Sequence, residues 1–596
     1  MDRISRLHAQ LSAAATSSNS SSNSSSPTSP FPPAAAGGAQ QPDVYVSHRD
    51  VVLEQHVYDM VLTADALAFV AELATTFAHD IDQLHQRRSA RRVAIEQQNL
   101  VPTFLRDTKV VRDDLSWKID PIPRILQDRR VDIGDVSPAN CEFLLQSLNS
   151  GAQGVQVDFD DGHCPTWTNT LLGHFNIMDA SRGKLAVPAK GLVLVRDPAL
   201  LVVRPRAWNM DEMNMLVNGV VVPGAVFDFG IHIFHNGKLL LENGRGPFLY
   251  LPKLEGYKEA ALWRKIFEHS EAKLGFPKGS IKATVLIENI FAALEMEEIL
   301  FELRHHSSGL NCGMWDYTAS IVVNFRHDKA CLLPDRQQCV SMRSDFLRHY
   351  MELLIRTCKR RNAPATTGMV PFVLDQLPPS LSRGDAIGKA KAGKQFEALA
   401  GSDGALVYDL ELVKPVQEIF SSARKEVDAK FRALDLTTPV NEAFYEKMLF
   451  MLPDGYVTKH SVESNLRVAL FYVLGWFYGK GTVVVNGCVE DSATAEISRA
   501  QLWQWIHHRV PLDDINNNNK TSTSTKSSER QHVNADLIRD LLLDIAREEV
   551  QKQTHQLKNL VAGINLVFRV VTMRSPPPFM TTFLLEQEPL TKSLER

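Results

Sequence analysis

Short apolar runs alternate with helical patterns between residues 121 and 410. Residues 281–287 form a mostly apolar run with several β-branched side chains, which is typical of a buried strand. In residues 289–303, apolar side chains recur every three or four positions, as along one face of a helix. Further strands are predicted at 154–161, 192–195, 200–203, 226–234, 248–251 and 368–373, and a helix at 346–358. This alternation predicts an α/β fold, a TIM barrel with insertions.

The sequence on both sides of this region has helical rather than strand-like patterns. Before it, residues 62–77 and 85–98 are predicted to be helices. After residue 411 no strand is predicted, and helices are expected at 413–434, 441–450, 461–478, 492–509 and 535–560. The chain therefore divides at about residues 46, 121 and 411, and the Asn- and Thr-rich segment within 511–534 is predicted to be a flexible loop.

Residues 1–45 are of low complexity, rich in Ser, Pro, Ala and Gly, and are predicted to be a disordered or targeting segment. Arg3-Ile4, five residues and then Gln10-Leu11 resemble an N-terminal peroxisomal import signal, which an import receptor would bind. A mitochondrial or plastid transit peptide and a merely disordered tail, which would leave the protein cytosolic, are the alternatives. The chain ends in Glu595-Arg596 and lacks the C-terminal Ser-Lys-Leu signal.

Composition narrows the possible functions. The net charge of -4 over 596 residues gives no reason to expect nucleic acid or an anionic membrane as a partner. No apolar run of about 18 residues occurs, so no transmembrane helix is predicted. The 7 cysteines are scattered without a C-x-x-C pair, which argues against structural zinc and against a secreted disulfide framework.

Two acidic residues follow strand-like segments in the middle of the chain. Glu288 stands directly after the run 281–287, and Asp316 follows the next short segment and its glycine, Gly313. In a parallel barrel, catalytic groups gather at the C-terminal strand ends. Two carboxylates there can bind Mg²⁺, which leaves open positions for water and substrate. The competing interpretation is that each acid is a helix cap or a solvated loop residue.

Several longer motifs closely resemble the A-type malate synthases, from about residue 55 to near the C-terminus. They are Pro165-Thr166-Trp167, Arg204-Pro205-Arg206-Ala207-Trp208, Phe227-Asp228-Phe229-Gly230, Tyr250-Leu251-Pro252-Lys253-Leu254-Glu255, Ile281 to Glu288, Gly309-Leu310-Asn311-Cys312-Gly313, Trp315-Asp316-Tyr317 and Glu490-Asp491-Ser492-Ala493-Thr494-Ala495-Glu496-Ile497-Ser498-Arg499. That family condenses acetyl-CoA with glyoxylate and hydrolyses the thioester to malate and CoA, using Mg²⁺. The resemblance implies an N-terminal helical clasp (46–120), a TIM barrel (121–410) and a C-terminal helical plug (411–596).

The resemblance also implies roles for individual residues. Glu288 and Asp316 would be the Mg²⁺ ligands, and Arg204 would be the catalytic arginine that faces the aldehyde and the developing enolate. Asp491 would be the general base, although its position before a helix also suits an N-cap. The backbone of Gly313, Met314, Trp315 and Asp316 would hold the glyoxylate carboxylate, with Gly313 allowing a close approach.

Three further acids, Asp158, Asp160 and Asp161, end a predicted barrel strand and by resemblance would orient the water molecules of the metal. The neighbouring pairs His305-His306 and His507-His508 are interpreted as surface or packing residues, because adjacent helical residues point in different directions. A homo-oligomer is possible.

The chain departs from the family at three positions near these residues. It has Ala207 where Gly is usual, Asn209 where His is usual and Met314 where Arg is usual. Ala207 would disturb the loop after Arg204 if that position needs a positive φ. Two alternatives to a malate synthase are therefore kept: a related barrel lyase that cleaves acyl-CoA thioesters, and a non-catalytic pseudoenzyme.

Overall fold

A computed structural model describes residues 42–47, 53–513 and 531–587 of the chain. Its centre is a closed barrel of eight parallel strands that follow one another in chain order. The strands are β2 (Val131–Val136), β3 (Gly154–Asp158), β6 (Leu200–Arg204), β9 (Phe248–Leu251), β10 (Lys282–Ile287), β11 (Ser307–Cys312), β12 (Ala365–Val370) and β13 (Gly404–Val407). The predicted TIM barrel is confirmed.

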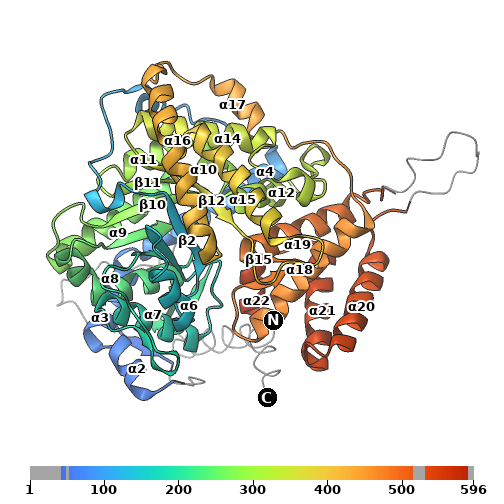
Figure 1. Ribbon diagram of the computed structural model, residues 1–596, viewed down its shortest axis with the longest axis horizontal. Coiled ribbons are helices and arrows are strands. Elements are labelled where there is room, and N and C mark those ends of the chain that lie inside the picture. Colours follow the sequence, from blue (N-terminus) through green and yellow to red (C-terminus); the bar gives the residue numbers. More distant parts are fainter. Residues whose placement is uncertain (1–41, 48–52, 514–530, 588–596) are drawn as a thin grey trace, which may run out of the picture. The chain divides into compact units, whose positions relative to one another are not determined.

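Helices cover the outside of the barrel (Figure 1). They are α6 (Cys141–Leu148), α7 (Trp167–Ser181), α8 (Gly224–Glu242), α9 (Tyr257–Leu274), α10 (Ile290–Ala293), α11 (Met296–Glu302), α12 (Met314–Asn324), α13 (Arg336–Cys339), α14 (Asp345–Arg360), α15 (Arg383–Ala400) and α16 (Val413–Ala433). Fully buried branched side chains such as Val155, Val203 and Ile287 fill the barrel wall. None of the described helices combines the length and the apolar character needed to cross a bilayer.

The N-terminal region packs against one side of the barrel. It consists of β1 (Val44–Val46), α2 (Gln55–Val61), α3 (Ala64–Thr76), α4 (Ala78–Gln98) and α5 (Lys109–Asp113). Strand β1 joins β7 (Asp211–Val217) and β8 (Val220–Pro223) in a small sheet. Helix α4 is tied to the barrel by Arg88, whose guanidinium donates to Glu259 at 2.7 and 2.8 Å.

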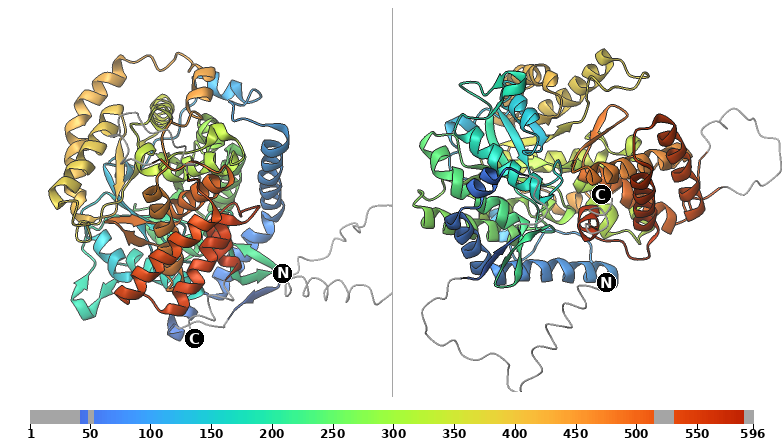
Figure 2. Two further views of the ribbon diagram at one scale, coloured as in Figure 1. Left: turned by 90° about the vertical axis from the view of Figure 1, so that its right-hand side faces the viewer. Right: turned by 90° about the horizontal axis from the view of Figure 1, so that it is seen from below.

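The C-terminal region is mostly helical. Apart from its first helix, which packs against α14, it gathers on one side of the barrel, where Figures 1 and 2 show it in orange to red. It contains α17 (Glu442–Met448), α18 (Lys459–Phe477), β14 (Val483–Val485), β15 (Cys488–Glu490), α19 (Ser492–His507), α20 (Ala535–Lys552), α21 (Leu557–Thr572) and α22 (Met580–Glu586). Helices α18 to α22 share a second apolar core that includes Leu466, Leu470 and Trp505.

The predicted strand at 226–234 is wrong, because these residues belong to helix α8. Their Val, Ile and Phe side chains suggested a strand. However, α8 lies between α3 and α7 and is buried on nearly all sides, so it needs no polar face. The predicted strand at 192–195 contributes only β5 (Leu192–Val193), which pairs with β4 (Ala186–Val187) outside the barrel.

Three other expectations need correction. The expected absence of strands after residue 411 is wrong, since β14 and β15 form a hairpin there. The helix predicted at 535–560 is two helices, because Gln553 adopts a left-handed conformation (φ 53°) after α20. The helix predicted at 289–303 is likewise divided into α10 and α11. The targeting segment lies almost wholly outside the described residues, as does most of the loop predicted at 511–534.

Candidate functional site

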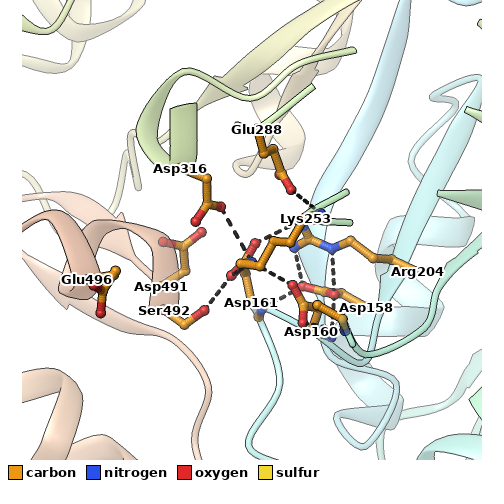
Figure 3. A network of polar contacts seen from close by, with 12 residues as sticks. Asp158, Asp160, Asp161, Arg204, Lys253, Glu288, Asp316, Asp491, Ser492 and Glu496 are labelled. Carbon is orange, nitrogen blue, oxygen red and sulfur yellow. Dashed lines mark hydrogen bonds and ion pairs between the residues drawn. The ribbon is translucent and has the colours of Figure 1, made fainter. Parts of the chain in front are cut away.

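The predicted site residues gather at the C-terminal ends of neighbouring barrel strands (Figure 3). Arg204 is the last residue of β6, and Glu288 directly follows β10. Asp316 lies in the first turn of α12, which begins just after β11. Parallel strands bring these three side chains to one end of the barrel although they are far apart in the sequence.

Three buried carboxylates form a group that can hold a metal ion. One oxygen each from Asp161, Glu288 and Asp316 lies within 4.8 Å of the others. The sequence prediction paired Glu288 with Asp316, and the structure brings these two together as expected. It adds Asp161, which was assigned only to orienting water. An all-oxygen donor set of this kind suits a hard divalent cation such as Mg²⁺.

Burial shapes the electrostatics of this group. Loss of solvent raises the pKa of Glu288 to about 7 and raises the pKa of Asp316 well above its usual range. The Lys253 ammonium opposes both shifts; it lies 2.6 Å from Asp161 and 3.4 Å from Asp316. The Lys253 backbone N–H also donates to Glu288 at 2.8 Å. Closely spaced, buried carboxylates need a positive charge beside them to stay ionised. A bound cation would supply such a charge, so this group has the electrostatics of a cation site.

Arg204 is surrounded by carboxylates. Its Nε donates to Asp158 at 2.7 Å, its Nη1 to Asp161 at 3.0 Å and its Nη2 to both Asp135 (2.9 Å) and Asp158. These anions raise the pKa of Arg204, so it is always charged. Four of its five N–H groups are thus used by described residues, and one N–H on Nη1 is left for another acceptor.

Asp491 reaches the same site from the C-terminal region. It is the N-cap of α19, and its Oδ1 accepts hydrogen bonds from the Thr494 N–H (2.9 Å) and hydroxyl (3.1 Å). Burial, followed by the nearby charge of Asp161, raises its pKa. Figure 3 shows Asp491 beside Asp316 and facing the cluster of acids. Asp491 therefore lies at the same end of the barrel as the predicted metal ligands, and the N-cap interpretation holds as well.

Backbone hydrogen bonds fix the segment that carries Asp491. In the hairpin, the Val489 N–H donates to the Pro371 carbonyl at 2.8 Å, and the Val373 N–H donates to the Gly487 carbonyl at 2.9 Å. The Ser492 hydroxyl donates to the Asp161 carboxylate. The barrel therefore holds the C-terminal region at residues directly before and after Asp491.

Gly313 and the first turn of α12, up to Asp316, lie against the metal-binding carboxylates. A Cβ added to Gly313 would lie 2.4 Å from Cγ of Glu288, so only glycine fits there. The Met314 and Trp315 side chains line the cavity, and the Arg336 guanidinium lies 5.2 Å from the Trp315 ring.

A cavity with an empty volume of about 630 Å³ joins these groups. It is lined by Arg204, Glu288, Asp316 and Asp491, together with both Asp161 and Asp135. The predicted metal ligands, the predicted base and the predicted arginine therefore line one cavity.

The other two predicted acids, Asp158 and Asp160, do not belong to the group of metal-binding carboxylates. They pair with positively charged side chains instead. Asp158 binds Arg204, and Asp160 accepts from the Lys253 ammonium at 2.6 Å. Asp160 also accepts from the Ala207 N–H at 2.9 Å. Ala207 is not among the described residues with positive φ, so its methyl group causes no backbone strain. Asn209 instead contacts α22, through a 3.3 Å hydrogen bond to Thr582.

The histidine pairs lie away from the site. His306 is fully buried, with Nδ1 3.1 Å from the Ile281 carbonyl, and His305 contacts Asp120. His507 lies 3.3 Å from His327, and His508 contacts the carbonyl of Arg326.

Sequence reasoning missed three residues of the site: Asp135, Lys253 and Ser492. Lys253 and Ser492 both lie inside motifs that had been singled out, but neither was given a role. The signal for Asp135 was weak, because its strand β2 alternates apolar and acidic residues and contains a glycine. Asp135 also adopts a positive φ of 53°.

A parallel barrel with buried carboxylates at its strand ends and a carboxylate brought in by a helical region defines a class: TIM-barrel enzymes with an acidic, cation-binding centre. The chain matches family models for the malate synthase N-terminal domain at 51–110, the malate synthase TIM barrel domain at 200–442 and the malate synthase C-terminal domain at 456–554. The chain belongs to the malate synthase family.

Three relatives agree with this assignment at the level of sequence. Malate synthase of Myxococcus xanthus is 41% identical over 77% of this chain and 83% of its own length. Malate synthase A of Escherichia coli is 36% identical over 76% of this chain and 84% of its own. A protein of Gossypium hirsutum named glyoxysomal malate synthase is 37% identical over 76% and 80%. A Haloferax volcanii malate synthase complex with magnesium and glyoxylate aligns with 12% identity and a TM-score of 0.35, over 70% of this chain and 89% of that one.

Proposed function

We propose that this chain condenses acetyl-CoA with glyoxylate and hydrolyses the resulting thioester, giving malate and CoA in a Mg²⁺-dependent reaction. The observation that carries this proposal is that Asp491, Arg204 and the carboxylates of Glu288 and Asp316 line one cavity. Each of these groups matches one requirement of the reaction: a base, a positive charge for the enolate and ligands for a cation.

Glu288 and Asp316 would hold the Mg²⁺, with Asp161 as a third oxygen donor within reach. When bound, the ion supplies Lewis-acid polarisation of the glyoxylate carbonyl. Lys253 holds Asp160 and Asp161 in place, and Gly313 leaves room for Glu288. These contacts would fix the ligand geometry without further ordering when the cation arrives.

Asp491 would remove a proton from the methyl group of acetyl-CoA. The Thr494 hydrogen bonds both end on Oδ1, so Oδ2, which shares the cavity with the Asp135 carboxyl, would take the proton. Its raised pKa makes the carboxylate a stronger base than an exposed aspartate. The remaining Nη1–H of Arg204 would stabilise the negative charge that develops on the thioester oxygen.

The first turn of α12 would bind the carboxylate of glyoxylate. Helix α12 starts at Met314, next to the metal group, and the N-terminal N–H groups of a helix favour an anion. Glyoxylate bound there would present its carbonyl to the cation and to the methyl group of acetyl-CoA.

Thiol release from acetyl-CoA in the presence of glyoxylate and Mg²⁺ tests this function. We expect release that depends on both additions, together with the formation of malate. Thiol release without glyoxylate, or cleavage of malyl-CoA without net condensation, would instead indicate a lyase or a thioesterase.

We also propose that the chain acts in peroxisomes or glyoxysomes. Two related proteins, one from Gossypium hirsutum and one from Cucumis sativus, are named glyoxysomal malate synthase. The N-terminal segment of this chain carries the Arg3-Ile4 and Gln10-Leu11 pairs. A fluorescent fusion of residues 1–45 should reach peroxisomes, and replacing the Arg3 and Leu11 side chains should prevent this. A mitochondrial pattern would favour the transit-peptide interpretation.

A further inference from the structure

A second cavity also reaches the metal carboxylates. Its empty volume is about 770 Å³, and Glu288 and Asp316 line it just as they line the first cavity. Its other walls come from the N-terminal helix α4, from α12 and from the segment before α22. Glu288 and Asp316 therefore stand where the two cavities meet.

The two cavities differ in the groups that they present. Asp491 and Arg204 line the first cavity and are not among the residues around the second. The acetyl group must reach Asp491, so the thioester and its long CoA chain belong in the first cavity. A bound CoA chain would then obstruct that approach for any other molecule.

The second cavity presents both signs of charge: Glu255 and Glu496 line it beside the two metal carboxylates, and its cations come from Lys253 and from helix α4. Arg88 and Arg92 of α4 line it, one helical turn apart. Arg88 is committed to Glu259 and the Lys253 carbonyl. Arg92 is exposed and has no hydrogen bond or ion pair with any other residue that the structure describes, so its charge is available. The opposite wall, on α12, contains the apolar side chains of Ala319 and Val323.

We propose that the second cavity is a separate passage by which the small carboxylate substrate reaches the metal carboxylates, and by which the small dicarboxylate product leaves. The passage allows glyoxylate to bind while CoA or acetyl-CoA fills the first cavity. This inference rests on the proposed function, because it assigns the first cavity to acetyl-CoA.

Narrowing the passage tests the proposal. In Val323→Phe, the larger ring would fill part of the second cavity, whereas Val93→Phe makes the same change at an exposed position of α4, where Val93 is 44% exposed. The measurement is the rate of glyoxylate binding to the Mg²⁺-loaded protein, followed by tryptophan fluorescence, with and without saturating CoA. CoA carries no acetyl group, so no condensation interferes.

We expect CoA to leave the glyoxylate binding rate of the wild type and of Val93→Phe unchanged within about twofold. Val323→Phe should bind glyoxylate at least about tenfold more slowly when CoA is present. If CoA blocks glyoxylate binding in the wild type, or if Val323→Phe behaves as the wild type does, the passage is refuted.

Charge reversal gives a second test. Arg92→Glu should lower kcat/KM for glyoxylate by about three- to tenfold at low salt, with convergence at high salt and no change in the KM for acetyl-CoA. Arg87→Glu, the same change on α4 outside the cavity, is the control. An equal effect of both variants would refute the role of Arg92.

A wild type that binds glyoxylate but releases no thiol would refute the proposed function. The rates of glyoxylate binding would still decide whether the passage exists.

Discussion

Replacing Asp491 with asparagine separates its two roles. The asparagine side chain would keep an oxygen at the Oδ1 position, and Asn caps a helix about as well as Asp. The Thr494 hydrogen bonds would therefore remain. The new amide group would face the acidic side chains of Asp135 and Asp161, and the substitution would remove a negative charge that burial and Asp161 already disfavour. We expect the free energy of unfolding to change by less than about 1 kcal/mol.

Turnover should respond very differently. A positioned general base contributes about 10²–10⁴-fold, which corresponds to about 2.7–5.4 kcal/mol at about 1.36 kcal/mol per tenfold change in rate. The kcat of Asp491→Asn, measured by thiol release, should fall by this factor. Glyoxylate affinity, measured by titration calorimetry with Mg²⁺ present, should stay within about threefold of the wild type, because Asp491 is not part of the metal group.

A control variant isolates the effect of the cap. Asn534 is the N-cap of α20 and accepts from the Leu537 N–H at 2.9 Å. It does not line the first cavity. Asn534→Ala should cost about 1 kcal/mol of stability and leave kcat unchanged. If Asp491→Asn turns over within about threefold of the wild type, or if it loses glyoxylate binding or unfolds, the assignment of Asp491 as the base is refuted.

Three further perturbations test the supports of the site and of the fold. Gly313→Ala would place a Cβ 2.4 Å from Cγ of Glu288, so the affinity for Mg²⁺, measured by calorimetric titration, should fall at least about tenfold; an unchanged affinity would show that Glu288 is not a ligand. Ser492→Ala removes the hydroxyl that donates to Asp161, and leaving that buried acceptor less satisfied should lower the free energy of unfolding in urea by about 1–3 kcal/mol; no loss would mean that the contact is not formed. Burial lowers the pKa of His232 to about 3, against about 6.5 in the unfolded chain, so the unfolded state binds more protons between these values. The stability that His232 contributes is complete above about pH 6.5 and is lost as pH falls toward 3, by up to about 1.4 kcal/mol per pH unit. His232→Leu should therefore flatten the plot of unfolding free energy against pH between pH 6.5 and 4.5. A slope identical to that of the wild type would contradict this.

The sequence predicted the parts of the barrel whose strands are apolar. Residues 281–287 are buried from end to end, so their composition alone shows a strand and marks Glu288 as the residue at its end. Asp316 could be placed for the same reason, because its loop follows a neighbouring strand. Parallel strands have one common C-terminal edge, so two strand ends predicted separately imply that their acids meet.

The sequence could not predict Asp135 in the same way. Strand β2 reads Val-Asp-Ile-Gly-Asp-Val, and its two acids are buried because they meet arginines: Asp132 pairs with Arg129, and Asp135 pairs with Arg204. A strand is predicted from a continuous apolar run or from an alternation of apolar and solvent-exposed polar residues. A strand whose polar residues face buried partners shows neither pattern. Arg129 lies only three residues before Asp132, but Arg204 comes from a distant segment, so only the folded chain shows why Asp135 is buried.

The hairpin before Asp491 carried a signal that was overlooked. Val483-Val484-Val485 and Cys488-Val489-Glu490 are separated by Asn486-Gly487, and an Asn-Gly pair between short apolar runs is a strong sign of a two-residue hairpin turn. The structure gives both turn residues positive φ, 51° and 80°, as a type I′ turn requires. This hairpin had greater consequences than its length suggests, because it positions the residue proposed as the base.

The N-cap and general-base interpretations of Asp491 were set against each other, but the geometry makes them complementary. A base that approaches a weakly acidic methyl group must be held still, since small errors in position cost catalysis. A side chain at the start of a helix is held by its own capping bonds, which here occupy Oδ1 alone. The hairpin bonds to Pro371 and Val373 fix the backbone just before it. The cap thus supplies the rigidity that the base needs, and the remaining oxygen supplies the reactivity.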